Sequence, residues 1–203
     1  MTIFNKCHAV FVGFLAYVIV ATVGYTINQG DFFQNEHLFI IAKAFLILLS
    51  VAYAKWFDMI YFGILSKKQL LLFIEVFLLP VLVNIGYHAF FSVASGASAQ
   101  HLEETSKGLS LSFIVSATVL APIQEEFMFR GIFQGAVFEN SWLGLVLTSS
   151  LFSFMHGPYD VPSFSYYLLG GLLLGFAYKK SQNLWVSTLV HMFYNSLPLL
   201  YYL

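Results

Sequence analysis

The sequence predicts an all-α fold, a polytopic membrane helix bundle of about seven transmembrane helices. Of its 203 residues, 59% are hydrophobic and only 9% are charged, and the mean hydropathy is +0.79. Soluble domains are roughly 45–50% apolar and about 25% charged. Apolar runs of the length that crosses a bilayer, about 20 residues, recur along the whole chain. The chain is therefore not a soluble domain.

Seven apolar segments are expected to span the membrane. The first resembles a secretion signal, but no small-x-small cleavage site follows it, so we expect an uncleaved helix. The polar stretch 94–108 divides an N-terminal part, residues 1–108 with about three helices, from a helical core at 109–203 that carries most of the polar residues of interest. The predicted spans are residues 8–28, 37–57, 69–93, 110–137, 142–159, 163–179 and 183–202.

The charges predict an orientation and exclude some partners. Seven of the basic residues fall on one side if the N-terminus is cytoplasmic, whereas Lys107 falls opposite and Lys43 lies inside the second span. We therefore expect a multi-pass protein of the cell membrane with its N-terminus in the cytoplasm. A net charge of −1 offers no basic surface for nucleic acid, and the single cysteine, Cys7, excludes an internal disulfide. The seven residues are Lys6, Lys55, Lys67, Lys68, Arg130, Lys179 and Lys180.

Three ionisable residues, Glu125, Glu126 and Arg130, lie close together in the fourth apolar segment. Ionisable groups in a bilayer need partners, water or a function. Glu126 and Arg130 are four residues apart and can pair on one helix face, whereas Glu125 lies about 100° around the helix. Two adjacent carboxylates in a poor dielectric do not both ionise cheaply. We expect a structural Glu126–Arg130 ion pair and a free Glu125 that accepts protons; an interfacial acid–base cluster is the alternative.

Two later segments carry further polar side chains. His156 ends an apolar run, where a histidine bonded to the helix backbone is the simpler interpretation. His191 and Asn195 are four residues apart, so an imidazole and an amide point the same way from one helix. A polar clamp between helices is the alternative for this pair. If residues 110–137 and 142–159 form an antiparallel hairpin, Glu125 and His156 lie at matching depths within one turn.

Proline and glycine positions predict local features of the helices. Pro122 removes a backbone hydrogen bond to the carbonyl of Thr118, so we expect a kink there, and Pro80 is expected to kink its helix too. Gly171 and Gly175 form a small-xxx-small pair that lets another helix approach closely. For these residues we expect packing roles.

Three motifs, in their order along the chain, resemble those of the CAAX-protease and bacteriocin-processing (CPBP, or Abi) family of intramembrane proteases. They are Glu125-Glu126 with Arg130, then Phe152 to His156, then His191 to Asn195. The resemblance covers about residues 110–203. It implies hydrolysis of a peptide bond within the membrane, in a lipidated protein or a peptide substrate.

Catalytic roles follow from the same resemblance. Glu125 and His156 would activate a water as general base, and His191 and Asn195 would stabilise the tetrahedral oxyanion. Family members are often labelled metalloproteases, and Glu125, His156 and His191 are also a ligand set for catalytic zinc. The sequence lacks His-Glu-x-x-His, and Asn195 suits an oxyanion donor, so we favour a mechanism without a metal or other cofactor.

Two other functions compete with proteolysis. A non-catalytic immunity or scaffold protein of the same fold is compatible with the resemblance, although the motif set is complete. A small transporter or proton channel could use Glu125, His156 and His191 as a relay, but no inverted repeat or pair of broken helices supports it.

Overall fold

The computed structural model describes residues 5–8, 11, 15, 18, 36–91, 103 and 109–197, and within these ranges the regular structure is helical, without a strand. Helices occupy six of the seven predicted segments. Most of the first predicted span and most of the polar stretch 94–108 lie outside the described residues. The elements are α2 (Glu36–Trp56), α3 (Lys67–Phe90), α5 (Leu111–Val115), η2 (Ser116–Leu120), α6 (Ala121–Glu126), η3 (Phe127–Val137), α7 (Trp142–Met155), α8 (Val161–Ser181) and α9 (Leu184–Ser196).

Four of these helical segments are long and apolar enough to cross a membrane: His37–Trp56, Lys67–Tyr87, Leu111–Val137 and Val161–Ser181. The protein is therefore a multi-pass, all-α membrane protein. At about 1.5 Å per residue, α7 with 14 residues and α9 with 13 are shorter than a bilayer core of roughly 30 Å. The range 142–159 was too long for α7, because the chain leaves the helix at His156 and Gly157 takes a φ of 61°.

Helix starts are fixed by side chains that accept hydrogen bonds from free backbone N–H groups. Ser66 makes a capping box with Gln69 at the start of α3. Asp160 accepts from Ser163 at 2.7 Å before α8, and these hydrogen bonds hold the pKa of its carboxyl below the usual value. Ser110, Ser141 and Asn183 cap α5, α7 and α9 in the same way.

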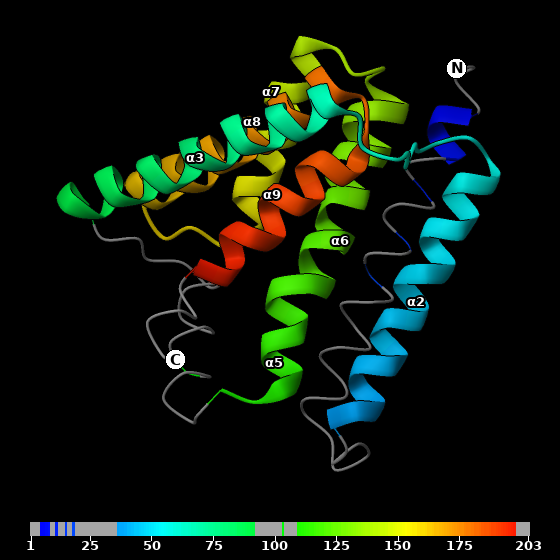
Figure 1. Cartoon of the computed structure of the whole chain (residues 1–203), viewed down its shortest axis with the longest axis horizontal. Coiled ribbons are helices and arrows are strands. Elements are labelled where there is room, and N and C mark those ends of the chain that lie inside the picture. Colours follow the sequence, from blue (N-terminus) through cyan, green and yellow to red (C-terminus); the bar gives the residue numbers. More distant parts are fainter. Residues whose placement is uncertain are drawn as a thin grey trace.

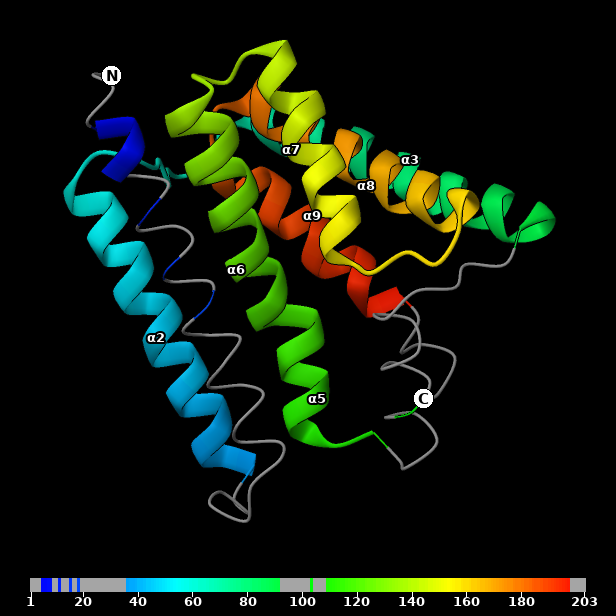
Figure 2. The ribbon, with the colours of Figure 1, turned by 180° about the vertical axis from the view of Figure 1, so that it is seen from behind.

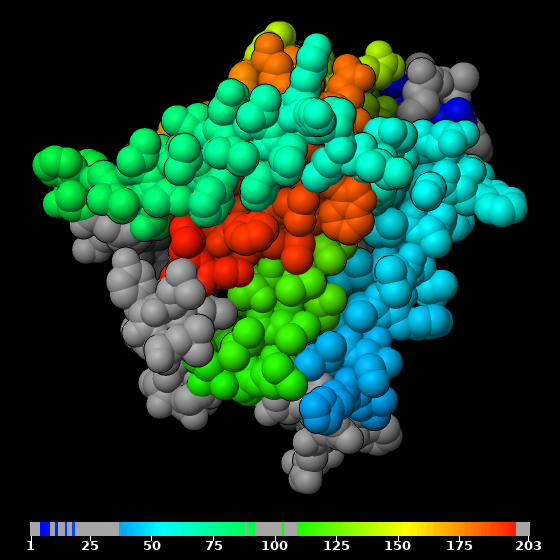
Figure 3. Space-filling view, viewed as in Figure 1, coloured from blue at the N-terminus to red at the C-terminus, as the bar shows by residue number. Residues whose placement is uncertain are grey.

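Helix α9 lies at the centre of the bundle and touches α3, α8, α6, η2 and η3. Figure 1 shows α3 and α8 running side by side across one end, with α9 crossing beneath them toward α6. In the view from behind, α2 stands beside the long helix that α5, η2, α6 and η3 form (Figure 2). The space-filling view shows α9 seated between α3 and that long helix (Figure 3). Polar residues of α9 therefore face several elements at once.

The largest apolar core joins five helices around this junction. Its members are all nearly inaccessible to solvent, so together they fix the distance between the long helix, α7 and α9. They are Val76, Met128, Phe129, Phe152, Leu174, Ala177, Val186 and Val190.

Two glycines of α8 let this helix approach α7 and η3 closely, as the small-xxx-small pattern predicts. A Cβ at Gly171 would lie 3.1 Å from backbone atoms of Ser149, and one at Gly175 would lie 2.9 Å from Oε1 of Gln134. Because glycine has no side chain, the backbone carbonyls of Gly171 and Gly175 are accessible to polar groups. Nη2 of Arg130 donates to the Gly171 carbonyl at 2.9 Å, and Nε2 of Gln134 donates to the Gly175 carbonyl at 2.8 Å.

Replacing Gly171 with Ala should therefore lower the free energy of unfolding by about 1–3 kcal/mol, because the backbone of α7 cannot yield as a flexible side chain would. Thermal unfolding in lipid nanodiscs measures the effect. Gly170→Ala is the matched control, since a Cβ there meets nothing within 4 Å. Equal midpoints for the two variants would show that the close approach of α7 and α8 is not as tight as described.

Candidate active site

The long helix is π-helical on both sides of Pro122, and the backbone pairing at Pro122 differs from the sequence prediction. In η2 the N–H of Ala121 bonds to the carbonyl of Ser116, five residues earlier. In that register Pro122, which has no N–H, stands opposite the carbonyl of Ala117 rather than that of Thr118. Nδ2 of Asn195 donates to the Ala117 carbonyl at 3.0 Å. Because Pro122 has no N–H to donate, the Ala117 carbonyl is left to accept the hydrogen bond that holds Asn195.

Glu126 is fully buried and shared by two partners. Its Oε1 lies 3.0 Å from Nη1 of Arg130 and 3.0 Å from Nδ1 of His191. The ion pair predicted between Glu126 and Arg130 is present, with side chains that are 0% and 1% exposed. Arg130 also lies over the ring of Phe152, with Cζ 4.6 Å from the ring centroid. Glu126 therefore joins α6, η3 and α9 through one carboxylate oxygen.

Glu125 points to a different face, as its position on the helix predicts. Its Oε2 lies 3.8 Å from Nε2 of His156 and 3.8 Å from Nε2 of His191. This oxygen is buried and has no hydrogen-bond partner among the described residues. The structure thus brings Glu125, His156 and His191 together from α6, the C-terminal end of α7, and α9.

The other nitrogen of each imidazole, Nδ1, already has a polar partner. Nδ1 of His156 lies 2.8 Å from the Phe152 carbonyl, which only accepts, so this nitrogen carries a proton. Nδ1 of His191 faces the Glu126 carboxylate, which favours a proton there as well. In neutral rings, both Nε2 atoms then present lone pairs toward Glu125. Three hydrogen-bond acceptors converge on one point, an arrangement that calls for a proton donor or a cation between them.

A cavity of about 540 Å³, its mouth included, opens beside these residues between α3, α7, α8 and α9. His156, His191 and Asn195 line it together. Glu125 does not line the cavity, but its carboxylate lies next to the imidazoles of His156 and His191, which do. Three of the four residues predicted to be catalytic therefore share one cavity, and the fourth contacts two of them. The rest of the lining includes Pro80, Val83, Tyr166, Tyr167, Gly170, Leu173, Val190 and Tyr194.

Several contacts of the site were missed by the sequence reasoning. Tyr167 stacks on His156 with ring centroids 4.4 Å apart. Asn84 donates to the hydroxyls of Tyr166 and Tyr194 at 2.6 and 3.1 Å, which ties α3 to α8 and α9 at the cavity wall. Asn84 was noticeable as a polar residue in an apolar segment, but tyrosines are frequent in this chain and carry no spacing signal.

Replacing Arg130 with Met should leave the Glu126 carboxylate without its cationic partner in the interior and destabilise the protein by about 3–5 kcal/mol. The double variant with Glu126→Gln as well should recover part of that loss, because no buried charge then lacks a partner. Thermal unfolding of the purified variants measures both. A double variant less stable than Arg130→Met would contradict the ion-pair account.

Comparisons with known proteins agree with this picture. The model of a family described as "Type II CAAX prenyl endopeptidase Rce1-like" matches residues 107–197. A Lactococcus lactis protein named "UPF0177 protein YvdC" is 30% identical over 130 residues, 63% of this chain and 49% of its own length. A Bacillus subtilis protein named "Putative membrane peptidase YdiL" is 27% identical over 126 residues, 61% of this chain and 50% of its own length. No solved structure matches.

The chain spans about half the length of the curated relatives it matches. The matching region begins just before α5 and ends after α9, so it contains Glu125, Glu126, Arg130 and the histidine and asparagine positions of the cavity. Over residues 107–197, slightly less than half of its length, the chain is similar to the Rce1-like family of type II CAAX prenyl endopeptidases, in agreement with the resemblance that the sequence motifs carry.

Proposed function

We propose that this protein is an intramembrane endopeptidase that hydrolyses a peptide bond of a membrane-associated peptide or lipidated protein. The observation that carries the proposal is the buried Oε2 of Glu125, which has no hydrogen-bond partner within the described part of the chain and lies 3.8 Å from two imidazole nitrogens. A carboxylate oxygen left this way in an apolar bundle costs stability. A scaffold or immunity protein has no need of it, whereas a hydrolase has a use for it.

The first step is the activation of water. A water between Glu125 and His156 would donate both protons to acceptors, one to Oε2 and one to Nε2. As its oxygen attacks the carbonyl carbon of the substrate, one proton passes to Glu125. The bond from Nδ1 of His156 to the Phe152 carbonyl supports this role, because it keeps Nε2 free as an acceptor.

The second step is stabilisation of the tetrahedral intermediate. Asn195 has two N–H donors; one is held by the Ala117 carbonyl, which fixes the amide, and the other is available to an oxyanion in the cavity. His191 lines the same cavity and would donate through Nε2 when that nitrogen carries a proton, while Nδ1 stays next to the Glu126 carboxylate. Donors of this kind contribute about 3–4 kcal/mol each to lowering the barrier. Transfer of the proton from Glu125 to the amide nitrogen then breaks the C–N bond.

Zinc is the alternative to a metal-independent mechanism. The chemistry of the donor set suits it: Glu125, His156 and His191 would hold the ion, with Glu126 and the Phe152 carbonyl behind the two imidazoles. Bound zinc would lower the pKa of its water and polarise the substrate carbonyl. In the described part of the chain, no group of three or more His, Cys, Asp or Glu side chains is arranged as a metal site. We keep the metal-independent mechanism as our proposal.

We also propose that the protein resides in the cytoplasmic membrane with its N-terminus inside, since that orientation places most of the lysines and arginines in the cytoplasm. The partners in this proposal are the lipid bilayer and the substrate peptide. No nucleic-acid partner is part of it.

Glu125→Gln, His156→Ala and His191→Ala should each reduce peptide cleavage by at least about 10²-fold, because each removes an acceptor or donor that acts on the reacting atoms. Purified protein in liposomes is incubated with a peptide library, and new peptide ends are counted by mass spectrometry. Glu75→Gln, which changes an exposed carboxylate on α3, is the matched control and should cleave normally. Wild-type cleavage by any of the three site variants would remove that residue from the mechanism.

A strong chelator should leave cleavage unchanged if Glu125 acts without a metal. The same assay is repeated after incubation of the purified wild-type protein with the chelator and removal of the excess. Activity that disappears and returns on addition of zinc would instead support the metal-dependent alternative.

A further inference from the structure

Gly170 of α8 differs from the two glycines that follow it on the same helix. Backbone atoms of Ser149 lie 3.1 Å from a Cβ built at Gly171, and Oε1 of Gln134 lies 2.9 Å from one built at Gly175. A Cβ built at Gly170 meets no atom of the described residues within 4 Å. Because a glycine inside a helix lowers stability relative to alanine, and close packing does not account for this one, Gly170 has another role.

The space in front of Gly170 belongs to the cavity beside the candidate active site, which Gly170 itself lines. Five residues of α8 line this cavity, and at about 100° per residue they form one stripe with Gly170 near its middle. A side chain at position 170 would therefore point into the cavity, whereas position 171 faces α7. The five residues are Tyr166, Tyr167, Gly170, Leu173 and Leu174.

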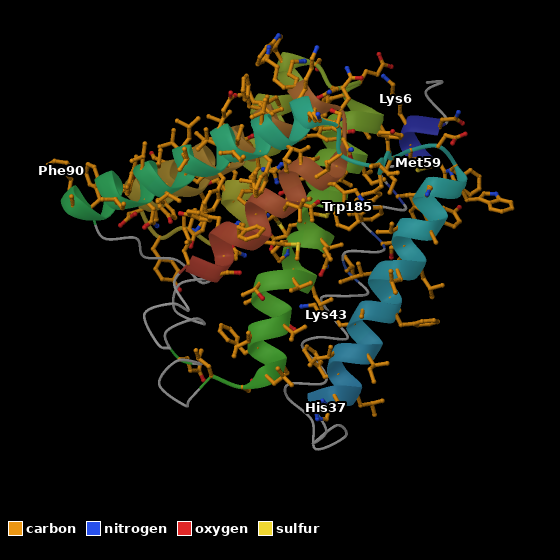
Figure 4. The ribbon with its side chains drawn as sticks, in the orientation of Figure 1. Lys6, His37, Lys43, Met59, Phe90 and Trp185 are labelled. Atoms are coloured by element: carbon orange, nitrogen blue, oxygen red, sulfur yellow. The ribbon has the colours of Figure 1, made fainter. Side chains whose placement is uncertain are left out.

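The cavity lies on the side of the bundle that faces away from α2. Figure 4 shows Trp185, near the start of α9, on the side of α2, whereas Phe90 lies on the opposite side, where α3 ends. The lining residues of α3, Pro80 and Val83, precede Phe90 by two to three helical turns, and those of α9 belong to its second half. Gly170 thus shares the cavity with α3 and the second half of α9.

The walls around Gly170 favour an apolar occupant. Apart from the three residues proposed to be catalytic, the described lining side chains are aliphatic or aromatic. The hydroxyls of Tyr166 and Tyr194 already accept hydrogen bonds from Asn84 at 2.6 and 3.1 Å. An apolar side chain gains free energy by leaving water for such walls, whereas a charged side chain loses its hydration there.

Gly170 also lies close to the proposed reacting centre. Tyr167, three residues earlier on the same face of α8, stacks on His156 with ring centroids 4.4 Å apart. Three residues advance a helix by about 4.5 Å, and an extended peptide advances about 3.3 Å per residue. A substrate side chain in front of Gly170 would therefore lie within about two residues of the scissile bond.

We propose that Gly170 is a specificity-determining residue, and that the space in front of it is a subsite for a large apolar side chain such as leucine, methionine or phenylalanine. This preference rests on the proposed function, because it concerns the residues beside a cleaved bond; the open space itself does not. A side chain placed at position 170 should exclude large substrate side chains and leave small ones able to bind.

Gly170→Leu tests the subsite through the sequence preference of cleavage. Protein in liposomes is given a peptide library, and the residues beside each new peptide end are determined by mass spectrometry. Relative to wild type, Gly170→Leu should cleave beside large apolar residues at least about tenfold less, and beside alanine at an equal rate. Its midpoint of thermal unfolding should not fall, because leucine forms helices better than glycine. An unchanged preference in the folded variant would overturn the proposal.

Gly86→Leu is the matched control. A Cβ at Gly86 on α3 also meets no atom of the described residues within 4 Å, but Gly86 does not line the cavity. This variant should keep the wild-type preference. The same change of preference in both variants would contradict a subsite at Gly170.

A single thiol measures the space without any substrate. Gly170→Cys is made together with Cys7→Ser, because Cys7 is the only other cysteine of the chain. In lipid nanodiscs the new thiol should react with benzyl methanethiosulfonate, and the attached benzyl group should leave the midpoint of thermal unfolding unchanged. A thiol that does not react, or a label that lowers the midpoint, would overturn the proposal. If the thiol is labelled but the wild-type protein cleaves no peptide, the proposed function fails, and the specificity role with it, while the open space stands.

Discussion

The structure depends on the Glu126 carboxylate, which is fully buried and holds Arg130 and His191 through one oxygen. Arg130 in turn donates to the Gly171 carbonyl, so a single network connects the long helix with α8 and α9. A buried pair of this kind adds little net stability, but breaking it leaves a charge without compensation. Its effect is to fix the ring of His191, with Nε2 directed at Glu125.

The side chains around this network are positioned by segments of the backbone that depart from a regular α-helix. The π-helical register leaves the Ala117 carbonyl opposite Pro122, and Asn195 takes that free acceptor. The end of α7 turns His156 back onto the Phe152 carbonyl. Each side chain near Glu125 is thus held by a second contact, which is the condition for a preorganised site. The cavity beside them is lined by His156, His191 and Asn195 together.

Much of this was predictable from the sequence because apolar length and helical spacing are local properties. They gave the helical class, the Glu126–Arg130 pair and the common face of His191 and Asn195. The contact between Glu126 and His191 joins residues 65 positions apart, and no local spacing reports it. The short α7 and the shift from Thr118 to Ala117 depend on a glycine turn and a π register, which periodicity does not resolve. The catalytic roles of Glu125, His156, His191 and Asn195 stay predictions.

Digestion of membrane-associated peptides in water labelled with heavy oxygen reports hydrolysis at Glu125, because a hydrolase transfers water oxygen to the new carboxyl end. If Glu125 activates the water, the wild-type protein gives labelled peptide ends and Glu125→Gln gives none. Labelled ends formed equally by both proteins would contradict the assignment of Glu125. Failure of the wild-type protein to produce any would contradict proteolysis itself.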